Sequence, residues 1–183
     1  MRAILFSLWM CASAAFATSS IQGVELAQQI RVDDQVLQLD GAGLLRWKGL
    51  FKVYVAAHYR ETPGAGFDLQ SDEAQALEIA YLRDVPPEGF VKATRLGLSK
   101  TLPAGEQLSD WQPDLDRFLD AYRGVVKGDR YQLGVNESGF HLAMNGQIIH
   151  RSDNAALGRR LLGVWLAENS PASGLRADLL ALN

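Results

Sequence analysis

The stretch LFKVYVAAHYR, residues 50–60, alternates between two sets of side chains. Phe51 and Val53 begin an apolar set, whereas Tyr54 and His58 belong to the set between them. Because successive residues of a strand point to opposite faces, this period of two predicts a β-strand with one apolar and one amphipathic face. The chain is therefore expected to build a sheet around this segment.

Turn sequences on both sides of this strand divide the chain into further strands. Asp33-Asp34, Trp47-Lys48-Gly49 and Asn145-Gly146 are such turns, and an Asn-Gly pair between two apolar runs is a strong hairpin signal. The other predicted strands are residues 24–32, 36–39, 44–46, 77–82, 131–135, 140–144 and 147–150.

Helices are predicted in two groups, each following a group of strands. They comprise a helix opened by Pro86-Pro87 and running to about residue 101, one over residues 111–122, one capped by Asp153 or Asn154, and one over residues 175–182. Strands, two helices, strands and two more helices indicate an α+β fold rather than an alternating parallel one.

The N-terminus has the parts of a secretory signal peptide. Arg2 precedes an apolar run that is too short to span a bilayer, and Ala15 and Ala17 form an A-x-A-like cleavage site. We therefore expect residues 1–17 to be a leader, residues 18–183 to form a single domain, and the protein to be periplasmic or secreted. The only cysteine, Cys11, lies in this leader, so the processed chain would lack thiol chemistry.

The composition is that of an ordinary globular domain. The chain has 183 residues, of which 48% are hydrophobic and 21% charged, with a net charge of −3. These values exclude long disorder, and they give little electrostatic support for nucleic-acid binding. No later segment is apolar enough to predict a membrane span, and the oligomeric state stays open.

The motifs of common catalytic and cofactor sites are missing from the sequence. His58, His141 and His150 have no neighbours at metal-ligand spacing, so neither a metal nor a cofactor is predicted. The pair Gly41-x-Gly43 lacks the third glycine of a dinucleotide-binding loop, and a turn or bulge explains it better.

The amphipathic face of residues 50–60 is the candidate site. Tyr54 and His58 flank the small Ala56, and the turn at residues 47–49 could fold Arg46 back over this face. A guanidinium and a phenol at the mouth of an apolar cleft would suit a carboxylate or phenolate. The alternative is a solvated sheet face that carries a surface arginine.

The segments Gly41-Ala42-Gly43-Leu44-Leu45-Arg46 and Phe51-Lys52-Val53-Tyr54-Val55-Ala56-Ala57-His58-Tyr59 resemble the signature of bacterial chalcone isomerase-like proteins. Further matching segments follow in order: Leu82-Arg83-Asp84-Val85, Lys127-Gly128-Asp129, Gly139-Phe140-His141-Leu142, Asn145-Gly146 and Gly163-Val164-Trp165-Leu166. The resemblance covers residues 22–182. It implies an open-faced β-sandwich, in which a large antiparallel sheet carries helices on one face and a ligand cleft lies between them.

The superfamily contains enzymes that close chalcones to flavanones as well as fatty-acid binders. The resemblance gives Arg46 the role of supporting an enolate in the enzymes or a carboxylate in the binders, although Leu44-Leu45 makes the motif one residue longer than usual. Tyr54 stands where the binders have tyrosine and the enzymes threonine. At the start of the first helix, where the enzymes have tyrosine and lysine, the chain has Phe90 and Lys92, and Ala155-Ala156 replaces a threonine-containing site.

These features favour an exported protein that binds a small apolar or amphipathic ligand with an anionic head, such as a fatty acid, without catalysis. The expected ligand contacts are Arg46, Tyr54, His58 and Phe90. An intramolecular lyase of the chalcone–flavanone type is the alternative, with Arg46 catalytic and Lys92 a doubtful second catalytic residue. Catalysis is less favoured because the missing hydrogen-bond donors would weaken stabilisation of the negative charge that develops on the substrate. A periplasmic interaction module with a vestigial cleft is the third possibility.

Overall fold

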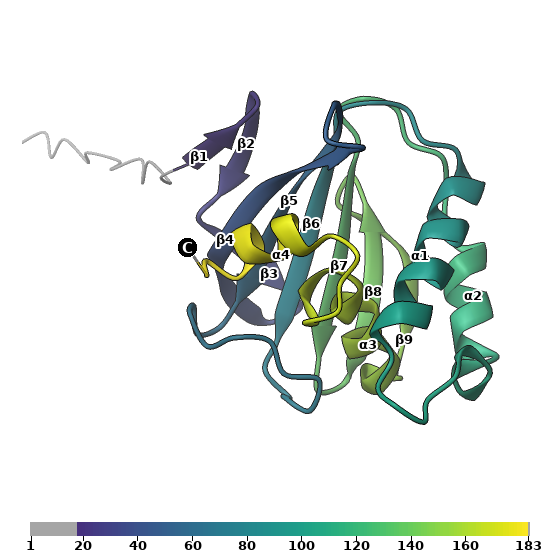
Figure 1. Cartoon of the computed structure of the whole chain (residues 1–183). Helices are drawn as coiled ribbons and strands as arrows, with labels where there is room; N and C mark the ends of the chain where they lie inside the picture. Colours follow the sequence, from purple (N-terminus) through teal and green to yellow (C-terminus); the bar gives the residue numbers. More distant parts are fainter. Residues whose placement is uncertain (1–17, 183) are drawn as a thin grey trace, which may run out of the picture.

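The computed structural model describes residues 18–182, and the expected leader, residues 1–17, lies outside them. Seven antiparallel strands form one curled sheet, in which each strand pairs with the next one along the chain (Figure 1). They are β3 (Gln29–Val32), β4 (Gln35–Trp47), β5 (Phe51–Arg60), β6 (Gln75–Tyr81), β7 (Arg130–Asn136), β8 (Gly139–Met144) and β9 (Gln147–Ser152). A separate hairpin of β1 (Thr18–Ile21) and β2 (Val24–Ala27) precedes the sheet.

The helices of the described chain pack against one face of this sheet (Figure 1). They are α1 (Pro87–Thr101), α2 (Asp114–Asp120), α3 (Ala155–Leu166) and α4 (Ser173–Leu179), with a short 3-10 helix, η1 (Leu108–Trp111). The helices α1 and α3 pack on each other, and α4 lies over β4 and β5. The predicted α+β class, with a large antiparallel sheet and helices on one face, is confirmed.

The continuous helix that the apolar stripe predicts over residues 111–122 is instead two elements. The 3-10 helix η1 ends at Trp111, and α2 begins at Asp114. Pro113 stands between them, and a proline disfavours the helical conformation of the residue before it. Leu115, Phe118 and Leu119 still form the buried face of α2.

The strands predicted at residues 36–39 and 44–46 are joined in the single strand β4. A bulge between Leu39 and Gly41 absorbs the irregularity, so Gly41 pairs with His58 and the ladder continues. The Gly41-x-Gly43 pair thus accompanies a bulge, as predicted, but it has a second role. A Cβ on Gly41 would lie 2.7 Å from the backbone of Leu179, and one on Gly43 would lie 2.5 Å from the Asp178 side chain. The two glycines therefore let α4 pack directly on the sheet.

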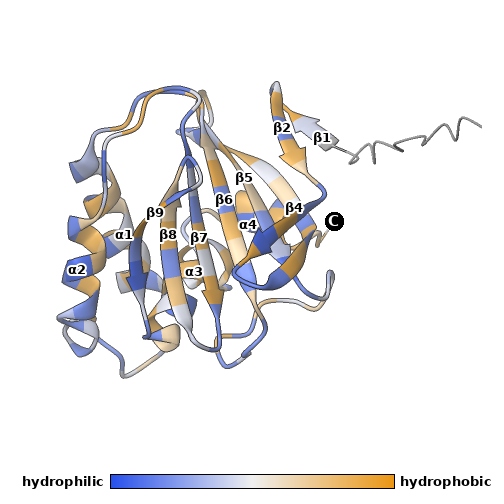
Figure 2. Ribbon diagram, turned by 180° about the vertical axis from the view of Figure 1, so that it is seen from behind, coloured by the Kyte–Doolittle hydropathy of each residue, from blue (hydrophilic) through white to orange (hydrophobic). Residues whose placement is uncertain are grey.

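Both faces of β5 are buried over most of its length. Tyr54 and Ala56 belong to the main core beneath the helices, whereas Val55, Ala57 and Tyr59 join a second cluster on the other face. Figure 2 views that other face, where the β1–β2 hairpin lies at the β4 edge of the sheet, and Leu26 of β2 belongs to the second cluster. The amphipathic face predicted for this strand is consequently not solvated.

Candidate functional site

A cavity of about 640 Å³ lies between the sheet and the helices. Its floor comes from β5, β6 and β7, one wall from α1 and the other from α3 and the chain that leads into α4. Small-molecule sites usually occupy roughly 300–1,000 Å³ and are mostly apolar, with a few polar groups that orient the ligand. The cavity has the size and chemistry of such a site.

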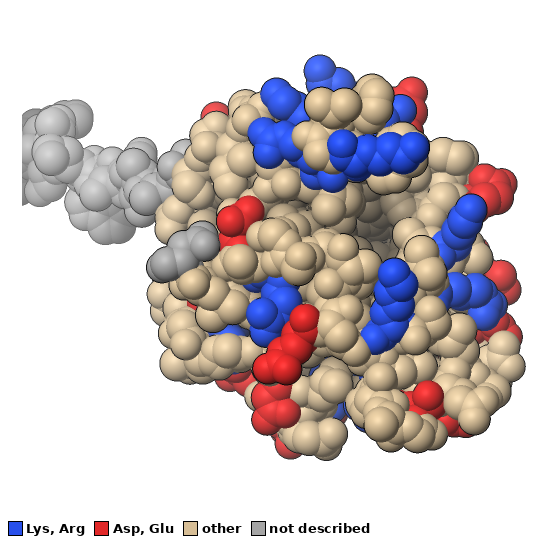
Figure 3. Space-filling view, viewed as in Figure 1, with Lys and Arg blue, Asp and Glu red and all other residues tan. Residues whose placement is uncertain are grey.

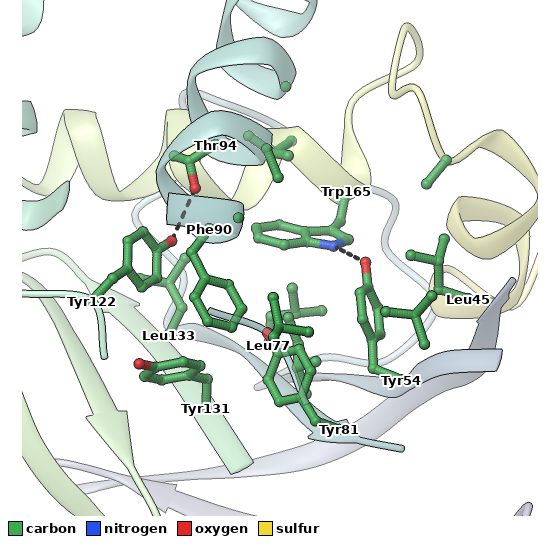
Figure 4. A pocket seen from close by; sticks show the side chains of 18 of the residues that line it. Leu45, Tyr54, Leu77, Tyr81, Phe90, Thr94, Tyr122, Tyr131, Leu133 and Trp165 are labelled. Carbon is green, nitrogen blue, oxygen red and sulfur yellow. Dashed lines mark hydrogen bonds between the residues drawn. The ribbon is translucent and has the colours of Figure 1, made fainter. Parts of the chain in front are cut away.

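Aromatic side chains form the centre of the cavity lining (Figure 4). The Phe90 ring lies 5.2 Å from Tyr122, 5.4 Å from Tyr81 and 5.4 Å from Tyr131, measured between ring centroids. The Tyr54 and Tyr81 rings meet edge to face at 5.7 Å. These edge-to-face and stacked contacts add rigidity beyond the area that the rings bury.

The four tyrosine hydroxyls in this lining differ in their partners. Trp165 Nε1 donates to Tyr54 Oη at 2.8 Å, and Tyr122 Oη is bonded to Thr94 Oγ1 at 3.0 Å (Figure 4). Tyr131 Oη donates to the Arg123 carbonyl at 2.8 Å. The Tyr81 hydroxyl has no hydrogen-bond partner within residues 18–182, so it is the phenol left free for a ligand.

Burial further stabilises the neutral form of these phenols. Loss of solvation raises the pKa of Tyr54 to about 12, although the hydrogen bond from Trp165 opposes the rise. Burial, together with the neighbouring tyrosines, also raises the pKa of Tyr81 well above its ordinary value. At neutral pH the cavity therefore presents hydrogen-bond donors and no phenolate.

The charged groups of the lining lie together. Arg83 and Asp84 follow the end of β6, where they line the cavity and are exposed to solvent. Asp84 Oδ1 accepts from the Lys127 amide at 3.0 Å, whereas Arg83 forms no ion pair with any described residue. Arg83 is the one cationic residue in the lining within residues 18–182. Figure 3 shows the surface hollowed beneath a cluster of Lys and Arg side chains.

Two of the predicted ligand contacts, Tyr54 and Phe90, line the cavity, but Arg46 does not. Leu45 and Trp47, on either side of Arg46 in β4, both line it, and alternate residues of a strand point to opposite faces. Arg46 is exposed outside the cavity, so the structure does not bring it together with Tyr54. The strand register decides this: Leu45, not Arg46, pairs with Tyr54, and a shift of one residue exchanges the two faces.

His58 shares a face with Tyr54 but lies beyond the cavity, in a buried polar cluster. Its Nδ1 is 3.2 Å from Asp40 Oδ2, and its Nε2 is 3.1 Å from Gln75 Oε1. Arg60, the next residue on this face, pairs with Glu73 and donates to the Gly66 carbonyl at 2.6 Å. His58 is fully buried and in contact with Asp40 and Gln75, so it is packed within the fold and does not line the cavity.

Of the helix positions that were compared with catalytic residues of the enzymes, only that of Phe90 lies in the cavity lining. Phe90 is buried in the lining, whereas Lys92 is exposed on α1 and is not part of it. Ala155 and Ala156 open α3 and lie outside the lining, to which α3 contributes Leu161, Val164 and Trp165. Neither position places a donor in the cavity.

Sequence reasoning missed three residues of the site: Tyr81, Arg83 and Trp165. Leu77, Ile79 and Tyr81 alternate along β6 and all line the cavity, so the period of two could have identified Tyr81. Trp165 lies on the apolar stripe of α3, where a cavity wall and a packed core have the same pattern.

Comparisons with known proteins agree with this architecture. A model of the chalcone isomerase-like family matches residues 18–181, and the chain belongs to that family. Among solved structures, the crystal structure of a fatty-acid binding protein from Arabidopsis thaliana matches with a TM-score of 0.68 and 16% sequence identity. That match covers 90% of this chain and 96% of the plant protein. No curated protein sequence matches significantly.

In the part of the chain that the structure describes, no helix is long and apolar enough to cross a membrane.

Proposed function

We propose that the protein binds a small apolar ligand with an anionic head, a fatty acid or a similar molecule, and that it does so without catalysis. The observation that carries this proposal is an apolar cavity with the Tyr81 phenol inside and the Arg83 guanidinium at its mouth, neither of which has a partner among the described residues. The fold likeness to a protein whose title describes fatty-acid binding supports the same conclusion.

The apolar part of the ligand would supply most of the affinity. Burial of hydrocarbon contributes about 25 cal/mol per Å² of surface removed from water, and the lining offers aromatic and aliphatic contacts throughout. The head group would lie toward the mouth, because a carboxylate deep among neutral side chains would lose its hydration without gaining a counter-ion. There Arg83 would pair with it, and the Tyr81 hydroxyl would donate to it.

Tyr54 has a related role in this proposal. Its oxygen accepts from Trp165, which leaves its own proton free to be donated to the ligand. Phe90 would contact the hydrocarbon. Arg46, which the family resemblance assigns to the head group, is replaced in that role by Arg83.

An isomerase would need donors aimed at the charge that develops on its substrate. Phe90 has no hydroxyl, Lys92 lies outside the lining, and the lining cation Arg83 is exposed to solvent. Binding therefore accounts for the cavity better than catalysis. The motifs and the leader-like residues 1–17 further lead us to propose a bacterial member of the family that is exported to the periplasm or secreted.

Titration with a fluorescent fatty acid, together with native mass spectrometry of the purified protein, tests the proposal. Ala93 and Ser99 are both exposed on α1, but only Ala93 lines the cavity, so Ala93→Trp adds a large side chain to the lining and Ser99→Trp does not. We expect Ala93→Trp to weaken binding at least tenfold and Ser99→Trp to leave it unchanged. Equal affinities for both variants would refute the cavity as the site, and chalcone conversion above the uncatalysed rate would favour the isomerase.

A further inference from the structure

The tip of the β4–β5 hairpin, residues 46–52, exposes large apolar side chains. Leu50 is 80% exposed, Trp47 55% and Phe51 51%. Isolated exposed apolar residues are common, but three of this size side by side on one projecting turn indicate an interaction surface. None of the three packs into either buried core cluster of the described chain.

The hairpin tip holds these side chains in a defined turn. The Leu50 amide donates to the Trp47 carbonyl at 3.3 Å, and Lys48 and Gly49 have φ of 52° and 72°. Positive φ at both central residues is the pattern of a type I′ turn, which matches the twist of a hairpin. The Lys48 ammonium lies 4.5 Å from the centre of the Trp47 ring, which itself lies 6.0 Å from the Phe51 ring.

Cationic side chains surround the apolar ones. Arg46, Lys48 and Lys52 all belong to the hairpin tip, and residues 41–60 contain no Asp or Glu. Arg83 lies nearby, because the Leu82 amide donates to the Val53 carbonyl at 2.9 Å. A chain with a net charge of −3 thus carries a positive cluster here (Figure 3). Aromatic side chains with adjacent Lys and Arg are typical of surfaces that meet anionic bilayers.

The hairpin tip is continuous with the mouth of the cavity. Trp47 belongs both to the tip and to the cavity lining, and Arg83 lies on the rim. Leu96 of α1, which is 52% exposed, also contributes to the lining. A planar surface that contacts the tip would consequently lie against the entrance through which a ligand passes.

We propose that the hairpin tip docks on the surface of an anionic phospholipid bilayer. Trp47, Leu50 and Phe51 enter the interfacial region, and Arg46 and Lys48 contact lipid phosphates. Docking aligns the cavity mouth with the bilayer, so an apolar ligand moves between lipid and protein without crossing water; this last step rests on the proposed ligand-binding function. The positive charge of the tip favours lipid phosphate over a neutral apolar partner.

Co-flotation of the purified protein with lipid vesicles tests the docking. Two vesicle types are compared, phosphatidylcholine alone and phosphatidylcholine mixed with phosphatidylglycerol. The test variants are Leu50→Ser with Phe51→Ser, and Arg46→Gln with Lys48→Gln. The matched controls are Val36→Ser, an exposed apolar residue near the other end of β4, and Lys100→Gln on α1. Fatty-acid binding is titrated for every variant in the absence of vesicles.

We expect the native protein to float with the mixed vesicles, less so as salt increases, and only weakly with phosphatidylcholine alone. Each double variant should lose at least tenfold in vesicle affinity, the controls should keep it, and all should bind fatty acid in solution as the native protein does. Fatty-acid binding without vesicle binding would overturn the docking inference and leave the proposed function intact. Self-association that the double variant Leu50→Ser with Phe51→Ser abolishes would assign the tip to a second copy and would overturn the docking inference as well.

Discussion

Replacing Tyr54 and Tyr81 separately by phenylalanine should affect stability differently, because the Tyr54 oxygen accepts from Trp165 whereas the Tyr81 hydroxyl bonds to no described residue. Tyr54→Phe leaves Trp165 Nε1 without the acceptor that it has at 2.8 Å. A donor left unpaired away from water costs about 1–3 kcal/mol, and the half-buried position of Trp165 favours the lower part of this range. For a protein of this size each kcal/mol corresponds to about 2–4 °C in Tm. We therefore expect Tyr54→Phe to lower Tm by about 2–8 °C.

The Tyr81→Phe substitution removes a hydroxyl that bonds to no described residue, so the ligand-free protein should change by less than about 0.5 kcal/mol. Its effect should appear on binding instead. A hydrogen bond to a charged group contributes about 1.5–3 kcal/mol, which corresponds to roughly a ten- to hundredfold weaker Kd for a carboxylate ligand.

Thermal denaturation of the ligand-free proteins and titration with a fluorescent fatty acid measure the two effects. A fatty alcohol of the same chain length serves as the control ligand, and Tyr81→Phe should weaken its binding less. The reasoning is refuted if Tyr81→Phe lowers Tm as much as Tyr54→Phe does. A fatty-acid Kd within twofold of the native value for Tyr81→Phe would place the head group elsewhere.

Three further substitutions test the cavity rim, the packing of α4 and the titration of a half-buried histidine. Arg83→Gln should weaken fatty-acid binding by only about two- to fivefold at low salt, because the guanidinium is solvated, and should leave fatty-alcohol binding unchanged in the same titration. Gly41→Ala should lower Tm, since the new methyl group meets the backbone of α4, whereas Gly174→Ala in α4 meets open space and should not lower it; equal Tm values would contradict the packing argument. Burial, followed by the nearby Arg117 charge, lowers the pKa of His150, while Asp114 opposes this. Below about pH 6.5 the His150 imidazole is therefore protonated more readily in the unfolded chain than in the folded protein. The free energy of unfolding consequently falls as the pH decreases. Between about pH 8 and about pH 5.5, the Tm of His150→Phe should fall less than that of the native protein. Equal decreases in Tm for the two proteins would contradict the assignment to His150.

Local patterns in the sequence determined the order of strands and helices. Alternation over residues 50–60 and turn residues such as Asn145-Gly146 specify backbone conformation within a few residues, so β5 and the β8–β9 hairpin were predictable. The break at Pro113 was missed because the apolar stripe of residues 111–122 continues across it.

The location of Arg46 depended on the register between β4 and β5. Leu45 pairs with Tyr54 and Arg46 with Lys52, so β5 contains one extra residue at the irregularity. Such a bulge is decided by hydrogen bonds across two strands, and it determines which side chains face the helices. The sequence of either strand alone does not contain that information.

The cavity itself is a property of the tertiary structure alone. A sequence pattern reports which residues avoid water, and Tyr81, Phe90 and Trp165 follow the same periodicities whether they meet neighbours or enclose space. Gly41 and Gly43 let α4 pack closely on the sheet, while α1, the later part of α3 and the strands beneath them enclose space that is left unfilled. The sequence by itself therefore determined the elements and their apolar faces. The distances between those faces, set by contacts among distant residues, decided that they enclose a site.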